Sequence, residues 1–165
     1  MIRTFVIALL AAVPLSACVG LSRSAPISPL ANADAAGYRV SEVRLQVEPE
    51  IQTTDAFDAI FRDRVQQTLN SCAAGLRPLR LEASIHRLDR ANPVQVAVIG
   101  GANVLRGHAR LVDPADGRVV GEYEIGRTVI GARVAVFEMA ESEEQLSAAF
   151  GRELCDQAFP SASAD

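Results

Sequence analysis

The sequence contains no lysine, so arginine supplies all 16 of its basic residues. Alanine is also abundant, and the two features together are typical of codon usage in a GC-rich genome; a surface selected for arginine is the alternative explanation. The chain also lacks an excess of positive charge, because 20 acidic residues give it a net charge of −4 at pH 7. A mildly acidic protein has no electrostatic footprint for nucleic acid, which we exclude as a partner.

The N-terminal segment lacks an apolar run long enough to cross a membrane. Its apolar residues extend from Phe5 to Val13, behind the single basic residue Arg3. A spanning helix needs about 20 apolar residues to cross about 30 Å of hydrocarbon. A short apolar run between a basic residue and a stretch of small residues is typical of a secretory signal peptide. We expect residues 1–17 to be a signal peptide that is removed.

The last residues of this segment, Leu15-Ser16-Ala17-Cys18, resemble the lipobox of bacterial lipoproteins. The resemblance implies that the Cys18 thiol receives a diacylglyceryl group, that the signal is cut before it, and that the freed amine is acylated. Several acyl chains make attachment stable, because each buried methylene contributes about 0.8 kcal/mol while one chain binds only marginally. The alternative is an ordinary secretory signal followed by an incidental cysteine.

The residue after the cysteine bears on location. Enteric lipoproteins that stay in the inner membrane have aspartate there, whereas this chain has Val19. The resemblance therefore implies the cell outer membrane, and we expect a periplasmic domain; display on the cell surface stays open. Loss of the signal removes Arg3 and no acid, which leaves 15 basic and 20 acidic residues and a net charge of −5.

The remainder divides into three parts. Residues 18–37 are small, polar and punctuated by proline, which predicts a lipidated cysteine followed by a flexible tether. Residues 38–160 are enough for a single domain with a core. Residues 161–165 are a frayed tail.

Hydrophobic periodicity predicts the elements of this domain. A strand is expected at 38–47, a helix from the N-caps Thr53-Thr54-Asp55 to the stop at Gly75, and a half-buried strand at 79–86. A hairpin follows, with strands at 105–112 and 118–125 around the turn 113–117. The capping box Ser142-Glu143-Glu144-Gln145 opens a last helix that Pro160 ends. We predict an α+β two-layer sandwich of order β-α-β-β-β-α, a mostly antiparallel four-stranded sheet with both helices on one face.

The hairpin register follows from matching both faces. It places Leu111 opposite Val119 on the buried face, while Arg106 lies opposite Glu124 and His108 opposite Glu122 on the exposed face. Both are favourable cross-strand pairs.

Two cysteines remain once Cys18 carries lipid, and they share a compartment in which disulfides persist. A right-handed crossover followed by two strand reversals makes the two helices parallel. Cys72 and Cys155 then lie toward the C-terminal ends of the two helices. We predict a Cys72–Cys155 disulfide; two buried free thiols are the alternative.

The architecture and the strand-turn-strand stretch 105–119 resemble uncharacterised proteobacterial lipoprotein domains. They are also loosely similar to the small α/β domains of curli-secretion and ABC-transport auxiliary lipoproteins. The resemblance spans residues 38–159, and it implies no functional residue.

Motifs for nucleophilic hydrolysis and phosphate binding are missing from the sequence, and no catalytic residue is assigned. Asp113 and Asp116 are interpreted as turn formers, since no acidic ligand series of a calcium loop follows them. If His86 lies opposite His108, a row of His86, His108 and Glu122 crosses the open sheet face. Such a row is a candidate zinc or divalent-metal site, although lone surface histidines are usually only solvated.

An apolar stretch after the hairpin runs from Val129 to Phe137. We interpret it as a strand continuation that packs in the core, with a partner-binding or membrane-proximal loop as the alternative.

The function expected from these observations is non-enzymatic and without a cofactor. A lipid-anchored, outer-membrane lipoprotein presents a small periplasmic domain that binds another envelope protein. The alternative is a periplasmic enzyme or metal-binding protein that uses the polar sheet face around His86 and His108.

Overall fold

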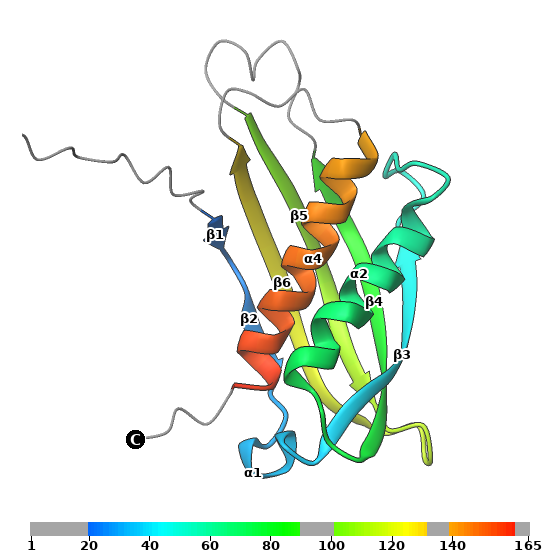
Figure 1. Cartoon of the computed structure of the whole chain (residues 1–165), viewed down its shortest axis with the longest axis vertical. Helices are drawn as coiled ribbons and strands as arrows, with labels where there is room; N and C mark the ends of the chain where they lie inside the picture. The colour runs from blue at the N-terminus through cyan, green and yellow to red at the C-terminus, as the bar shows by residue number, and fades with distance from the viewer. Residues whose placement is uncertain (1–19, 90–100, 132–138, 161–165) are drawn as a thin grey trace, which may run out of the picture.

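The computed structural model describes residues 20–89, 101–131 and 139–160. Within these ranges, six strands form one sheet, and the long helices α2 (Phe57–Cys72) and α4 (Met139–Ala158) pack against each other on one of its faces (Figure 1). A short helix, α1 (Asn32–Ala35), precedes the third strand. The strands are β1 (Gly20–Ser22), β2 (Ala25–Ser28), β3 (Tyr38–Val47), β4 (Arg77–Asp89), β5 (Gly101–Val112) and β6 (Val119–Gly131).

The strand order is β1-β6-β5-β4-β3, and β2 also pairs with β6. Only the β3–β4 pair is parallel among the described strands, because α2 connects these two strands; the other pairs are antiparallel. The predicted α+β class, the order of its main elements and the placement of both helices on one face are confirmed. The four-stranded sheet is wrong in extent, because two N-terminal strands enlarge it.

These two strands come from the segment that was expected to be a flexible tether. β1 pairs with Arg127 to Val129 of β6, and β2 pairs with Glu122 to Glu124. Leu30 then enters the core, and its N–H donates to the Tyr123 hydroxyl at 2.8 Å. Every residue of β2 is exposed, so backbone pairing holds this strand and no hydrophobic period marks it in the sequence.

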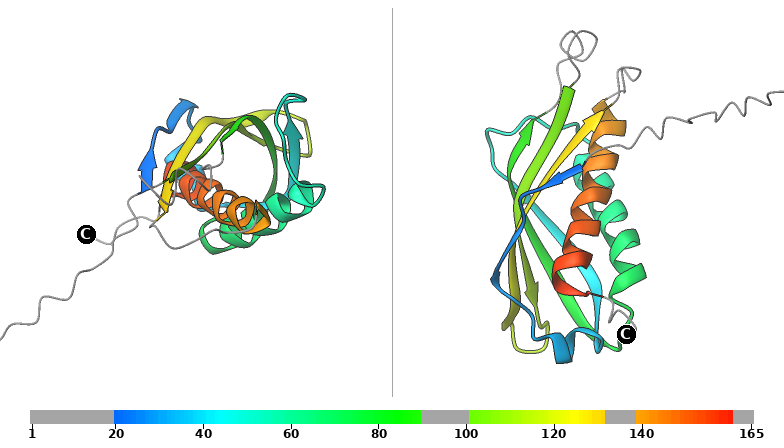
Figure 2. Two further views of the ribbon diagram at one scale, coloured as in Figure 1. Left: turned by 90° about the horizontal axis from the view of Figure 1, so that it is seen from above. Right: turned by 90° about the vertical axis from the view of Figure 1, so that its left-hand side faces the viewer.

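The core lies between the helices and the face of the sheet that curves around them (Figure 2). Alternate residues of β4, such as Leu81 and Ile85, point into it, as period-2 strands require. The helices contribute three fully buried aromatic rings. The ring centroid of Phe61 lies 5.9 Å from that of Phe57 and 5.2 Å from that of Phe150, and both pairs have edge-on geometry. Such pairs add about 0.5–1.5 kcal/mol each beyond their area burial.

The hairpin closes differently from its prediction. The N–H of Asp113 donates to the Arg118 carbonyl at 2.8 Å, and Gly117 adopts φ +74°, a conformation that glycine accepts without steric cost. The register then shifts between Leu111 and Val112. The combined effect moves the pairing by two residues from the predicted register, which leaves every side chain on its predicted face but changes its partner.

Both helix starts also differ from the predicted caps. α4 begins at Met139, so the expected capping box lies inside the helix. Its Glu143 is fully buried, and its carboxylate accepts hydrogen bonds from the N–H and the hydroxyl of Thr54, ahead of α2. The N-cap of α2 is Ala56, without a side-chain hydrogen bond. A contact between segments far apart in the sequence therefore takes the place of two local caps.

The structure contains the predicted disulfide between Cys72 and Cys155, whose Cα atoms are 5.8 Å apart. Thr68 and Gly151 lie one turn before these cysteines. A Cβ on Gly151 would come within 2.9 Å of the Thr68 Cβ, closer than real Cβ atoms approach. The missing side chain lets α2 and α4 approach closely where the disulfide joins them.

A double variant, Cys72→Ser with Cys155→Ser, should lower the free energy of unfolding by about 4 kcal/mol, because the bridge closes a long loop in the unfolded chain. Urea denaturation with and without reductant measures this: reductant should bring the wild type to the stability of the double variant and leave the variant unchanged. Two alkylatable thiols at these positions in the unreduced native protein would contradict the disulfide.

Because the hydroxyl of Tyr123 is buried, the free energy of unfolding depends on pH in the alkaline range. Burial raises the pKa of Tyr123, and the hydrogen bond from the Leu30 N–H offsets part of this rise. The unfolded chain therefore ionises first, near pH 10. The stabilisation is fully present below that pH and is lost as the pH rises through it toward the folded-state pKa.

A Tyr123→Phe variant should lose about 1–2 kcal/mol near neutral pH, because the buried Leu30 N–H loses its acceptor. The free energy of unfolding of the wild type should fall above about pH 10 as Tyr123 ionises in the unfolded chain, and this contribution should be absent in the variant. Urea titrations at several pH values measure both effects. Parallel curves for wild type and variant over the alkaline range would contradict the assignment.

Candidate functional site

The face of the sheet opposite the helices is open and polar. On β4 the residues that alternate with the core residues point to this face, among them Arg80, Glu82 and Ser84. Glu82 lies 2.9 Å from an Arg80 nitrogen and 3.5 Å from an Arg110 nitrogen. The carboxylate charge is thus compensated by two guanidinium groups, which is typical of a solvated charged surface.

A second group on this face begins at an irregularity in β4. Ile85 pairs with Gly107 and Arg87 pairs with Arg106, so His86 is an extra residue in its strand. Such a bulge changes the direction of a side chain relative to the regular pleat. Gly107 makes it possible: a Cβ there would lie 2.5 Å from the Ser84 carbonyl oxygen.

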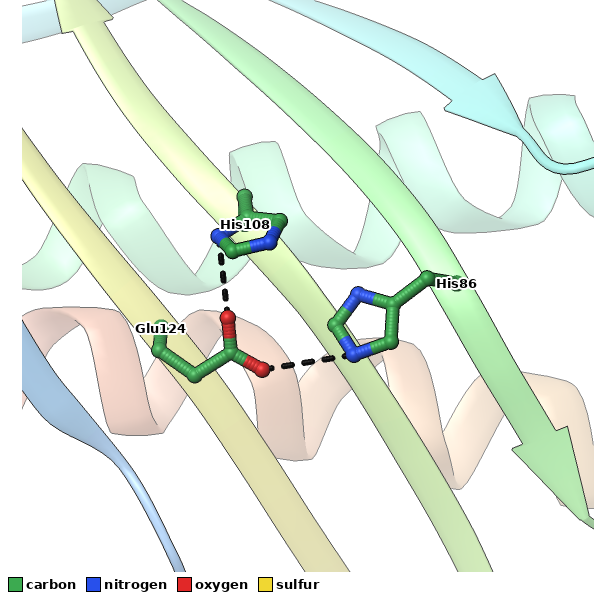
Figure 3. Close-up of side chains that lie close together, drawn as sticks. All are labelled: His86, His108 and Glu124. Carbon is green, nitrogen blue, oxygen red and sulfur yellow. Dashed lines mark ion pairs between the residues drawn. The ribbon is translucent and has the colours of Figure 1, made fainter.

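The two imidazoles meet at one carboxylate, that of Glu124 on β6, which lies directly opposite His108 of β5. The Nε2 atom of His86 is 3.3 Å from one Glu124 oxygen, and the Nδ1 atom of His108 is 2.9 Å from the other. Figure 3 shows the carboxylate with one oxygen directed at each ring, and the ring centroids are 5.2 Å apart. We call His86, His108 and Glu124 the His-Glu cluster.

One nitrogen of the cluster lacks a partner. The Nδ1 atom of His86 is inaccessible to solvent and has no hydrogen bond to any group in the described ranges. In Figure 3 it lies on the side of the ring that faces His108. A buried polar atom without a partner costs about 1–3 kcal/mol. The cluster therefore holds an unused acceptor or ligand position.

Depressions lie on both sides of the cluster. His108 lines one of about 270 Å³ together with Glu82 and Arg110. His86 lines another of about 390 Å³, with Glu50 and Gln52 from the β3–α2 connection. The side chains of His86 and Glu124 are only 29% and 28% exposed. The side chain of His108 is 48% exposed, so the cluster is reachable from solvent.

The structure brings together two of the three predicted metal candidates. His86 and His108 converge, but the third member is Glu124 and not the predicted Glu122. The correction follows from the two-residue shift in the hairpin, which places Glu122 opposite Arg110. Asp113 and Asp116 accept hydrogen bonds from the N–H groups of Ala115 and Arg118, in agreement with their interpretation as turn formers.

Other predicted positions lie partly outside the described residues. Cys18 and the tail 161–165 do, and so do Val134, Val136 and Phe137 of the apolar stretch. Val129 and Ile130 continue strand β6, as the strand interpretation of that stretch expected. No helix in the described ranges has the length and apolar character needed to span a membrane.

Sequence reasoning missed a buried carboxylate that holds the N-terminal strand. Glu153 of α4 is 5% exposed; it accepts a hydrogen bond from the Ser22 hydroxyl at 2.5 Å and pairs with Arg127 of β6 at 3.1 Å. Nothing in the local pattern around Glu153 marks it as buried, because its partners lie in β1 and β6. The expectation of a tether also left β1 without an assigned place.

The comparison with solved structures agrees on the fold. A PelC dodecamer from Paraburkholderia phytofirmans is 17% identical, with a TM-score of 0.52 over 85% of this chain and 99% of that one. A DUF330 family protein from Xanthomonas campestris is 14% identical, with a TM-score of 0.50 over 79% and 86%. No protein-family model and no curated protein matches the sequence. At these identities the likeness shows a shared fold.

Proposed function

We propose that this protein is a lipoprotein anchored through acyl chains on Cys18 to the periplasmic face of the outer membrane. Its domain binds another envelope protein and is not an enzyme. The observation that carries the proposal is the position of β1, which begins at Gly20, two residues after the lipobox cysteine. The lipid and the folded domain are therefore almost directly joined.

The short connection limits where the domain can be. Two residues span at most about 7 Å, since an extended chain advances about 3.3–3.6 Å per residue. A flexible tether of residues 18–37 would have allowed a far larger range. The β1 end of the sheet therefore lies close to the lipid headgroups, and the domain works at the membrane surface.

Hydrogen bonds join the N-terminal segment to strand β6 and helix α4. The Arg23 N–H donates to the Gly126 carbonyl at 2.8 Å, and the Gly126 N–H donates to the Ser24 hydroxyl at 3.1 Å. The buried Glu153 adds its contact with Ser22. These contacts hold the N-terminal segment against the edge of β6 and against α4.

The open polar face and the edge strand β3 are the surfaces left for a partner. The helices occupy the other face, and the N-terminal strands cover the β6 edge. Arg44 and Glu42 form an ion pair on β3, which favours a specific polar interface over open-ended strand pairing. A second copy of this chain is the first partner to test, because the PelC structure of the same fold is a dodecamer.

The lipid anchor is tested by metabolic labelling with a clickable palmitate. The wild-type protein should carry the label and sediment with the outer membrane, whereas a Cys18→Ser variant should lose both properties. The Cys72→Ser, Cys155→Ser double variant is the matched control and should keep its label. An unlabelled Cys18 peptide in the wild-type protein would contradict the anchor.

The partner is tested by crosslinking in intact cells followed by affinity isolation and mass spectrometry. One envelope protein or a ladder of self-crosslinked copies should be recovered reproducibly, and charge reversal at Arg110 on the open face should reduce the yield several-fold. A charge reversal at Arg62, on the helix side, serves as the control. Recovery of the monomer alone, without a crosslinked product at any concentration of crosslinker, would refute the binding function.

A further inference from the structure

Both histidines of the 165-residue chain belong to the His-Glu cluster. They come from different strands, and their rings meet at one carboxylate. We propose that His86, His108 and Glu124 bind one divalent transition-metal ion, with zinc as the best match. The proposal goes beyond the lipid-anchored binding function and does not depend on it.

The donor set fits zinc chemically. Two imidazole nitrogens and one carboxylate oxygen are ligands of catalytic and exchangeable zinc sites, in which a fourth position stays open to water or another ligand. Purely oxygen ligands would favour magnesium or calcium, and the imidazoles favour zinc, copper or nickel instead. Cys72 and Cys155 are joined in a disulfide, so neither has a thiolate that could compete for the ion.

The distances are close to those of a bound site. One ligand atom from each residue lies within 4.8 Å of the other two. Around a tetrahedral zinc ion with bonds of about 2.0–2.1 Å, ligand atoms are about 3.3 Å apart. Closing this gap requires the two rings and the carboxylate, which are partly exposed, to rotate toward one another.

The electrostatics of the open face distinguish this cluster from its neighbours. The Glu82 carboxylate has two arginines beside it. Among the described residues, Glu124 forms its ion pairs with the two imidazoles. A neutral imidazole supplies no positive charge, so a divalent cation would supply the charge that the arginines supply to Glu82.

The backbone holds these side chains in a fixed arrangement. The three residues lie on three adjacent strands of one sheet, a more rigid support than a loop. The bulge at His86 changes the direction of its ring, and the missing side chain of Gly107 leaves room for the close approach of Ser84 beside it. An alanine at position 107 would push the strands apart beside the cluster.

The experiment titrates zinc into the purified, chelator-treated full chain in detergent. Isothermal titration calorimetry gives the stoichiometry, and long-range proton–nitrogen NMR reads the two imidazoles directly. We expect one zinc ion per chain. The NMR signals of both histidine rings should shift together and stop changing at one equivalent of zinc. Cobalt should compete with zinc and give the visible absorption of a four- or five-coordinate site.

Matched variants locate the site. Glu124→Gln should weaken zinc binding more than about tenfold, since even loss of a second-shell group costs about 10- to 100-fold. His86→Gln and His108→Gln should do the same. Glu122→Gln makes the same chemical change two residues along β6, opposite Arg110, and should leave the affinity within twofold.

Thermal unfolding of each metal-free variant checks that its fold is intact. Saturating zinc should raise the unfolding temperature of the wild type and of Glu122→Gln, but not that of Glu124→Gln. Equal affinity in the Glu124→Gln and wild-type proteins would overturn the proposal. Imidazole signals that do not move at one equivalent, or several weak ions per chain in all variants, would overturn it too.

Discussion

The pairing of the N-terminal segment with β6 is the interaction on which the rest of the structure depends. β6 would otherwise be an edge strand with unpaired backbone groups, an arrangement that proteins usually avoid. Here β1 and β2 cover that edge through backbone hydrogen bonds and through Ser22, which contacts the buried Glu153. Through this pairing the described fold begins at Gly20, two residues after Cys18, the proposed site of the lipid anchor.

Successive residues of β6 connect this edge to the core and to the open face. Tyr123 points inward and accepts the Leu30 N–H, while Glu124 points outward and holds both imidazoles. Ala25 of β2 lies opposite Glu124, so the strand that carries the carboxylate has a neighbour on each side. The proposed metal site is thus built on an interior strand, and the N-terminal segment makes it interior. A membrane attachment close to β1 would place the site near the bilayer.

Elements with a hydrophobic periodicity were predicted from the sequence, and elements held mainly by backbone hydrogen bonds were missed. Strand β3 was predicted with its observed limits, because its residues alternate between core and solvent. β1 and β2 were missed because they are only three and four residues long, and the exposed residues of β2 show no such period. The cluster was predicted in part: the histidines were placed on one face, but the observed hairpin register differs by two residues from the predicted one and replaces Glu122 by Glu124. The contacts of Glu143 and Glu153 join segments far apart in the chain, where local patterns give no signal.

The central proposal is that the folded domain begins at Gly20, two residues after Cys18, the proposed site of lipidation. Amide hydrogen exchange of the lipidated protein tests it most directly at Arg23 and Leu30, whose N–H groups bond to β6. The account predicts that both amides exchange slowly, with protection approaching that of the β5–β6 hairpin. Exchange of both at the rate of an unstructured peptide would show that the segment is a free tether, and the account would then be wrong.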